Sequence, residues 1–164
     1  MREVPGQGRF PLGLSLQWHN GLHLQAPRDA SGQSYEPVRA IADGTIKFVG
    51  KPCAQSNDPK HAQNYNPDSH NETESDSRWT DNGLVIVEHT TDIGADDVSG
   101  LPTRITYYSA YHHLKELAMI DLKPSKAQPA KSRELAVGDK VWRKDILGQP
   151  GSIFGQPGQI HLEV

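Results

Sequence analysis

The hydrophobic residues of this chain occur in short runs rather than in long helical repeats. From Leu12 onward, alternating or β-branched runs are separated by turn-forming residues, which is the pattern of β-hairpins and small sheets. The run 40–49 alternates around Asp43-Gly44, a pair typical of tight hairpin turns. The run 84–89 is the most apolar and predicts a central strand, whereas 104–113 has two semi-polar faces, which suits a strand beside a cleft. The pattern predicts an all-β fold of mostly antiparallel sheet.

Two polar segments interrupt the predicted strands. The range 51–82 is rich in Asn, Asp, Ser, Gln, Pro and His and almost lacks aliphatic residues, and the range 90–103 holds Asp92, Asp96 and Asp97. Loops longer than about 12 to 15 residues are usually functional or disordered. We therefore expect a single all-β domain over 1–164, with 51–82 and 90–103 as long inserted loops.

Composition narrows the class of protein. The chain has 164 residues, 35% of them hydrophobic, and no apolar run approaches the roughly 20 residues of a membrane-spanning helix. With 17 basic and 20 acidic residues, the chain lacks the electrostatic footprint of a nucleic-acid binder. Cys53 is the single cysteine, so an intramolecular disulfide and a thiolate metal cluster are excluded. The amino-terminal segment is broken by proline and glycine, so we expect no signal peptide.

Histidine is the residue type that most clearly suggests a chemical function, since the chain holds eight. His19 and His23 lie four residues apart on a segment that contains Gly21. Neutral imidazoles are good ligands for Zn²⁺. Pairs with this spacing also arise by chance, so the spacing alone leaves open a metal pair or two ordinary surface histidines.

A series of sequence phrases extends the histidine pair over most of the chain. In chain order they are His19-Asn20-Gly21-Leu22-His23-Leu24-Gln25-Ala26-Pro27, Pro37-Val38-Arg39-Ala40-Ile41-Ala42-Asp43-Gly44-Thr45-Ile46, Gly83-Leu84-Val85-Ile86-Val87-Glu88-His89, Tyr111-His112-His113-Leu114, Val137-Gly138-Asp139-Lys140-Val141, Ile146-Leu147-Gly148 and Gln159-Ile160-His161-Leu162-Glu163-Val164. This series resembles the lysostaphin or LytM-type zinc peptidases, a family of β-proteins that cleave peptidoglycan. The resemblance implies a LytM-like fold of the duplicated-hybrid-motif type.

The resemblance also implies a site. His19, His23 and His161 correspond to zinc ligands, and His113 and Gln159 to the residues that handle protons and charge around the attacked carbonyl. Position 23 is His where the family has Asp, and three imidazoles still make a good catalytic zinc shell. Position 159 is Gln where the family has His, and a glutamine amide is no general base. We therefore expect His113 to act as base and proton shuttle, and the Gln159 amide to donate a hydrogen bond to the oxyanion.

The other histidines have plainer interpretations. His89 ends an apolar run and is expected to be structural. His112 precedes His113 on a predicted strand, where successive side chains point to opposite faces, so only one of the two should face the metal. His61 and His70 lie in the polar insertion and are expected to be solvated, although contact with substrate or a second metal stays open. The aromatic residues Tyr107, Tyr108 and Trp79 are equally compatible with a cleft and with the core.

The resemblance implies a zinc-dependent hydrolase of peptidoglycan amide bonds, either an endopeptidase or an N-acetylmuramoyl-L-alanine amidase. The substrate would be a peptidoglycan stem peptide or glycopeptide, and the cofactor Zn²⁺. The alternatives are a degenerate, non-catalytic LytM domain that binds peptidoglycan or regulates another hydrolase, and an unrelated zinc hydrolase of small peptides. Gln159 and His23 motivate the non-catalytic alternative.

The expected site of action is the periplasmic or extracellular cell wall. Without a signal peptide, the chain would reach it as part of a longer protein, as a lysin released by lysis, or as an antibacterial effector delivered by a non-Sec secretion machine. The chain ends directly after the segment 161–164, which favours excision from a longer protein. The further partners expected are an additional C-terminal domain or an immunity protein.

Overall fold

The computed structural model describes residues 2–3, 20–64, 78–122 and 131–164. The elements in this part of the chain are β1 (Arg2–Glu3), β2 (Gly21–Gln25), β3 (Val38–Arg39), β4 (Gly44–Gly50), the short 3-10 helix η1 (Ala62–Asn64), β5 (Gly83–Ala95), β6 (Pro102–Leu117), β7 (Met119–Leu122), β8 (Lys131–Glu134), β9 (Lys140–Val141), β10 (Ile146–Ile153) and β11 (Gln156–Glu163). The strands pair antiparallel throughout. The prediction of an all-β, mainly antiparallel fold is confirmed.

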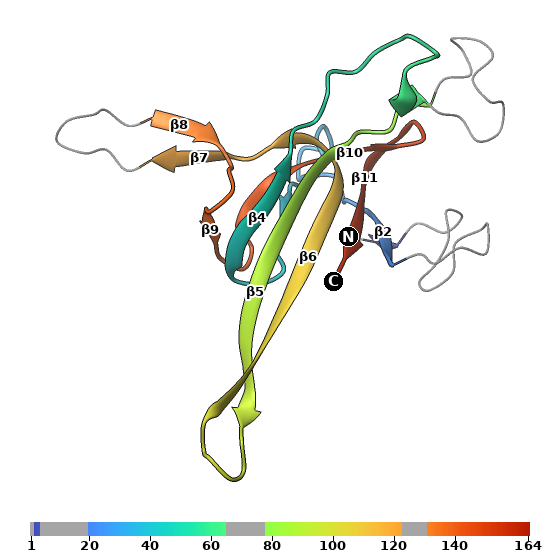
Figure 1. The fold of residues 1–164 in the computed structure, drawn as a ribbon. Coiled ribbons are helices and arrows are strands. Elements are labelled where there is room, and N and C mark those ends of the chain that lie inside the picture. The colour runs from blue at the N-terminus through green and yellow to red at the C-terminus, as the bar shows by residue number, and fades with distance from the viewer. Residues whose placement is uncertain (1, 4–19, 65–77, 123–130) are drawn as a thin grey trace.

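One nine-stranded sheet organises the described residues (Figure 1). Its main path runs β1-β2-β11-β10-β6-β5-β4-β9, with β3 paired to β10 and a second two-stranded sheet formed by β7 and β8. Strand β6 shares one edge between two neighbours, because its residues 110–112 pair with β11 and its residues 114–117 pair with β10. This arrangement brings the C-terminal strand against the centre of the sheet.

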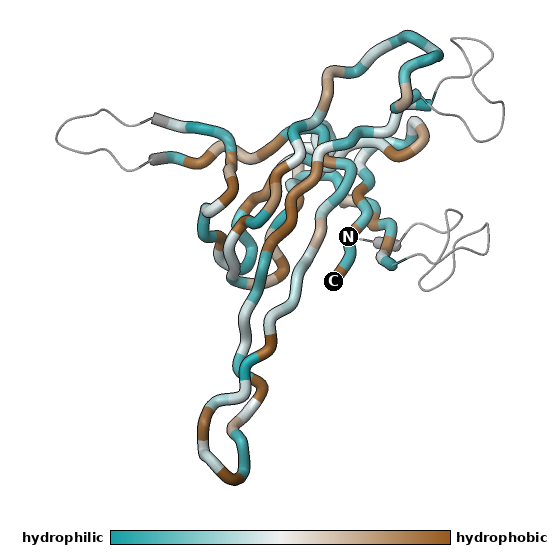
Figure 2. The backbone as a smooth tube through the Cα atoms, viewed as in Figure 1, coloured by the Kyte–Doolittle hydropathy of each residue, from teal (hydrophilic) through white to brown (hydrophobic). Residues whose placement is uncertain are grey.

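The hairpin of β5 and β6 is the longest element and extends well beyond the rest of the sheet (Figure 1). The range 90–103, which the sequence analysis assigns to an inserted loop, mostly forms the outer part of this hairpin, because 90–95 and 102–103 are strand. Its residues are exposed, so no apolar alternation marks them. Figure 2 shows hydrophobic residues in the central strands and again at the hairpin end, where Ile93, Val98 and Leu101 are exposed.

The hydrophobic core lies on one face of the sheet. It contains buried side chains from most strands and from the connections that fold over them, namely Val38, Ala40, Ile46, Val85, Val87, Tyr111, Leu114, Leu117, Leu135, Val141, Leu147 and Ile160. The alternation of β5 follows from this, because Val85 and Val87 are buried and their neighbours are only partly so. The opposite face of β2, β11, β6, β5 and β4 is therefore more open to solvent and carries both polar and apolar side chains.

Two β-bulges break the alternation and place consecutive side chains on that opposite face. In β4 the register shifts between Ile46 and Phe48, and in β6 His113 is passed over, because Leu84 pairs with His112 and Gly83 with Leu114. A bulge inserts one unpaired residue and changes the face on which later residues lie. Consistent with this, Tyr111 and Leu114 are both buried in the core although they are three positions apart.

His89 is part of the core rather than of the open face. It is 1% exposed, its Nδ1 lies 2.8 Å from the backbone oxygen of Asp43, and its Nε2 lies 2.7 Å from Ser109 Oγ. The Asp43 oxygen can only accept, so Nδ1 carries the proton of this hydrogen bond. This agrees with the structural role expected for His89.

The described ends of the 51–82 segment, 51–64 and 78–82, contain η1 and no strand. Asp81 attaches this segment to β10, because its backbone N–H donates to the Ser152 oxygen and its carboxylate Oδ2 accepts from the Ser152 N–H. The carboxylate also accepts from Trp79 Nε1 at 3.0 Å.

Among the described residues, no helix is long and apolar enough to cross a bilayer.

A half-buried carboxylate in the turn before β9 gives a test of the fold. Asp139 accepts hydrogen bonds from both terminal nitrogens of Arg133, at 2.8 and 2.5 Å, and from the Ala136 N–H. The Arg133 guanidinium is the main reason why the pKa of Asp139 is lowered. We expect Asp139→Asn to lower the free energy of unfolding by about 1–2 kcal/mol at neutral pH.

The sign of the pH dependence follows from the direction of that shift. A carboxyl whose pKa is lower in the folded state stabilises the fold above its unfolded pKa of about 3.9, and this contribution fades as the pH falls through the folded value. Urea unfolding of wild-type protein and Asp139→Asn should therefore differ at neutral pH and converge on acidification. A difference that stays constant down to about pH 3 would contradict this assignment.

Candidate metal centre and catalytic histidines

Three histidines lie in a row across neighbouring strands on the open face of the sheet. His161 in β11 pairs with His23 in β2 on one side and with His112 in β6 on the other. Directly paired residues of antiparallel strands share a face of the sheet. The ring centroids are 4.9 Å apart for His23 and His161 and 5.5 Å for His112 and His161. The register of three strands thus assembles an imidazole cluster.

The donor atoms of His23 and His161 face each other. His23 Nε2 lies 3.0 Å from His161 Nδ1, and His23 is 8% exposed. Two nitrogens that each lie about 2.0–2.1 Å from a tetrahedral zinc are roughly 3.3 Å apart. The two residues therefore fit a zinc ion as two of its ligands.

The third predicted ligand, His19, lies outside the described residues. Within the described ranges, no group of three His, Cys, Asp or Glu side chains is arranged to hold a metal ion. The structure thus brings His23 and His161 together as the sequence analysis expects, and describes two of the three donors.

His113 occupies the bulge of β6 and has a left-handed backbone, with φ of 65°. This conformation is uncommon outside glycine and often accompanies functional sites. Its Nδ1 lies 2.7 Å from the backbone oxygen of Asp81, so Nδ1 carries a proton and Nε2 keeps its lone pair. The His113 and His161 ring centroids are 6.5 Å apart. A neutral imidazole with one available lone pair therefore lies beside the predicted metal ligands.

Strand alternation does not separate the side chains of His112 and His113 as expected. Strict alternation would separate the two side chains, but the bulge removes it, and both rings lie near His161. The sequence analysis therefore missed His112. The usable signal is the three-residue spacing between Tyr111 and Leu114, two apolar residues that both belong to the core.

Burial keeps both β6 histidines neutral near pH 7. The pKa of His113 is lowered mainly by burial, against a smaller opposite effect of its hydrogen bond to Asp81. The pKa of His112 is also lowered mainly by burial, and the negative charge of Glu163 partly opposes this. A neutral imidazole is the form that accepts a proton, so the environment favours base chemistry at these rings.

Gln159 lies two residues before His161 on β11 and is 3% exposed. Its Oε1 has no hydrogen-bond partner among the described residues. A buried polar atom left in this state costs about 1–3 kcal/mol. Rotation of the amide exchanges its donor and acceptor ends. The Gln159 amide is therefore available to a ligand in the site.

Two close contacts explain residue choices around the cluster. A Cβ at Gly21 would overlap His161 Nε2 and the Leu162 carbonyl, so only glycine fits between the two histidine strands at this point. Glu163 Oε1 lies 3.1 Å from His161 Nε2, on the side of the ring opposite His23. A carboxylate on the second nitrogen of a metal-binding histidine fixes the ring and raises its basicity.

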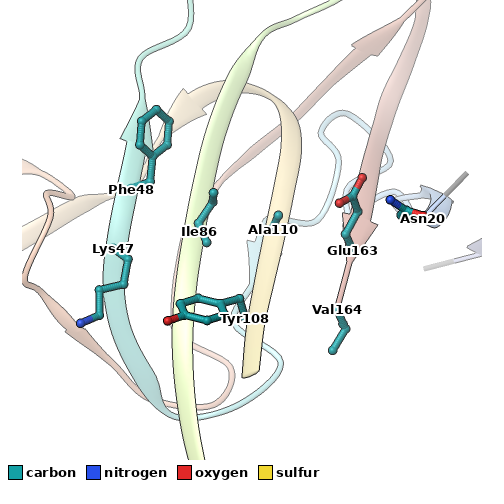
Figure 3. Close-up of a pocket in the computed structure, with 8 residues that line it drawn as sticks. All are labelled: Asn20, Lys47, Phe48, Ile86, Tyr108, Ala110, Glu163 and Val164. Carbon is teal, nitrogen blue, oxygen red and sulfur yellow. The ribbon is translucent and has the colours of Figure 1, made fainter. Parts of the chain in front are cut away.

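A pocket of about 680 Å³ opens beside the histidine cluster (Figure 3). It is lined by Asn20, Lys47, Phe48, Ile86, Tyr108, Ala110, Glu163 and Val164. Glu163 belongs both to this pocket and to the surroundings of His161. Ala110 lies two residues before His112 in β6 and on the same face. The pocket therefore continues the histidine site along the sheet.

The remaining aromatic and histidine candidates lie in different surroundings. Of the three aromatics left open by the sequence, Tyr108 lines the pocket, Tyr107 stacks on His89 at 4.8 Å, and Trp79 is buried. His61 packs against Trp79 with ring centroids 5.3 Å apart. His70 lies outside the described residues.

Comparisons of the chain with protein-family models, with curated proteins and with solved structures found no match.

Proposed function

We propose that this chain is a zinc-dependent hydrolase of peptidoglycan amide bonds with a LytM-like fold. The observation that carries the proposal is the pair of facing donors, His23 Nε2 and His161 Nδ1 at 3.0 Å, with His112 and His113 beside them on one sheet face. Neutral imidazoles of this kind are good zinc ligands and suit its hydrolytic chemistry. The peptidoglycan substrate rests on the resemblance of the ordered sequence phrases to lysostaphin or LytM-type peptidases.

In this proposal, His23 and His161 hold the zinc ion together with His19. The ion, when bound, supplies Lewis acidity that polarises the scissile carbonyl and lowers the pKa of a bound water. Glu163 Oε1, 3.1 Å from His161 Nε2, holds the His161 ring with its Nδ1 aimed at His23. The residue His23 stands where the family has Asp, so the site has three neutral ligands and retains more of the metal's positive charge.

His113 moves the proton. Its Nδ1–H donates to the Asp81 carbonyl, which leaves Nε2 to take a proton from the attacking water. The water oxygen then bonds to the carbonyl carbon, the carbon–nitrogen bond breaks, and the proton on Nε2 passes to the leaving amine. The products are one carboxylic acid and one amine, and water is the only co-reactant.

Gln159 stabilises charge rather than moving protons. Its buried amide can present an N–H to the oxygen on which negative charge develops. One preorganised donor of this kind contributes about 3–4 kcal/mol to transition-state stabilisation. His113 is then the proton-transferring residue and Gln159 the hydrogen-bond donor.

Digestion of purified sacculi tests the proposal. We expect wild-type protein with zinc to release soluble fragments whose masses contain one added water for each cut amide bond. Release should stop when zinc is removed by a chelator and resume when zinc is restored. Fragments that appear equally with and without zinc would contradict the metal dependence.

The specific observation that favours the second candidate, a non-catalytic peptidoglycan-binding or regulatory domain, is Gln159 itself. Glutamine cannot exchange a proton near neutral pH, so the site has one titratable group fewer than the family pattern. Under this alternative, the zinc-loaded protein would bind sacculi from several bacterial types and release nothing. Sedimentation of the protein with sacculi, scored beside fragment release, separates the two functions.

A further inference from the structure

We propose that the pocket lined by Phe48 and Tyr108 is a subsite for an amino-sugar ring, so that the amide presented to the histidines is the one joining the muramoyl lactyl group to the first amino acid. This inference rests on the proposed function and deepens it, because it selects the amidase reaction over the endopeptidase reaction. The pocket volume of about 680 Å³ lies within the range of about 300–1,000 Å³ typical of small-molecule sites.

The shape of the pocket suits a ring. Ile86 and Ala110 form its floor, Phe48 stands on β4 at one side, and the Tyr108 ring lies across β5 (Figure 3). Phe48 on β4 is 48% exposed and Tyr108 on β6 is 50% exposed. Exposed aromatic faces over a small apolar floor are the surface on which the C–H face of a pyranose stacks. Asn20 and Glu163 on the far side supply polar groups for hydroxyl and N-acetyl substituents.

A β-bulge in β4 accounts for the exposure of Phe48. Ile46 is fully buried and Val49 packs against the core, so the bulge between them directs both Lys47 and Phe48 to the open face. Regular alternation would have left only one of the two there. A second β-bulge, in β6, places both His112 and His113 on this face. One bulge thus exposes Phe48, and the other brings His112 and His113 to the same face.

Tyr108 is held in position before any ligand arrives. Its hydroxyl donates to Glu88 Oε2 at 2.8 Å, and Glu88 Oε1 pairs with Lys47 Nζ at 2.8 Å. In Figure 3 the Tyr108 ring lies across β5 toward Lys47. A ring fixed in this way loses little conformational entropy on binding.

The charges around the pocket favour a neutral ligand over a free peptide. The pocket's cation, Lys47, is paired with Glu88, and the carboxylate of Glu163 lies beside His161. A stem peptide carries carboxylates and an amine that need charged partners of opposite sign. An N-acetylated sugar carries hydroxyl and amide groups, which need hydrogen bonds and an apolar platform instead.

The position of the pocket fixes which bond reaches the histidines. Ala110 and His112 are two residues apart on one strand, which corresponds to about 7 Å. Glu163 bridges the pocket and His161. The lactyl group joins the muramic-acid ring to the peptide through only a few bonds. A ring seated over Ala110 at the inner end of this pocket therefore directs the lactyl amide toward the cluster.

Binding of two probes by the 164-residue chain tests this subsite without requiring hydrolysis. The probes are a chitin tetrasaccharide, which has N-acetylated sugar rings and no peptide, and a synthetic stem peptide without sugar. Isothermal titration should detect the tetrasaccharide, and Phe48→Ala and Tyr108→Ala should each weaken it about tenfold by removing an aromatic platform. Phe48→Leu keeps the apolar volume and should also weaken binding. Ile93→Ala, an exposed apolar position on the outer hairpin, is the matched control and should change nothing.

The outcomes separate this inference from the proposed function. Tetrasaccharide binding that depends on Phe48 and Tyr108 supports the subsite even when sacculi are not digested. Absence of tetrasaccharide binding, or binding of the peptide alone with the same dependence on Phe48 and Tyr108, overturns it. Thermal melting of each variant confirms that the compared proteins are folded.

Discussion

His161→Ala should abolish zinc binding while leaving the sheet intact. His161 is the central residue of the cluster, since its Nδ1 faces His23 and its Nε2 lies beside Glu163. Loss of an outer partner of a metal ligand already costs about 10–100-fold in affinity, so loss of the ligand itself should cost more than about 100-fold. Zinc content after dialysis, measured by atomic emission, should fall from one ion per chain to background.

The control for this experiment is His61→Ala. His61 packs against Trp79 and lies outside the cluster, so its loss should leave the zinc content unchanged. Circular dichroism should show the same β spectrum for both variants. Zinc retained at full stoichiometry by His161→Ala would mean that the metal binds elsewhere.

His113→Ala should lower turnover by about 10²–10⁴-fold, the usual contribution of one general acid–base residue. The imidazole is preorganised by the Asp81 carbonyl and by the left-handed bulge, and burial keeps it neutral. Zinc content should stay at the wild-type value, because His113 is not one of the proposed ligands. The measurement is the initial rate of amide cleavage by zinc-loaded enzyme.

His112→Ala is the paired variant, because the bulge places both histidines beside His161. The proposed mechanism requires a much larger rate loss for His113→Ala than for His112→Ala. The reverse order would assign the base to His112. Equal and small losses would remove both histidines from the proton path.

The all-β fold follows from local pattern, whereas the outer hairpin does not. Alternation along 84–89 reports the burial of Val85 and Val87. The range 90–95 has no buried face, so only its pairing with β6 reveals that it is strand. Pairing between distant residues leaves little trace in the sequence of one strand. The sequence therefore predicts the core strands better than exposed extensions of them.

The residues of the candidate site are likewise predicted only in part by the sequence. His23 and His161 are 138 positions apart, and only the ordered phrases, not composition or periodicity, indicate that they meet. The open-face positions of Phe48 and His112 depend on bulges, which are set by how two strands align. The sequence analysis left Tyr108 open between cleft and core, because its role depends on which face of β6 it occupies. Bulges thus account for two site residues that the sequence did not single out.

Zinc-dependent restoration of hydrolysis on one defined muropeptide tests the central claim most directly. The protein is freed of metal by a chelator, zinc is added back in steps, and cleaved amide is quantified by mass spectrometry. We expect no cleavage without metal and full activity at one zinc per chain, with no recovery in His161→Ala. Cleavage by the metal-free protein, or complete zinc loading without cleavage of any muropeptide, would contradict a zinc amide hydrolase.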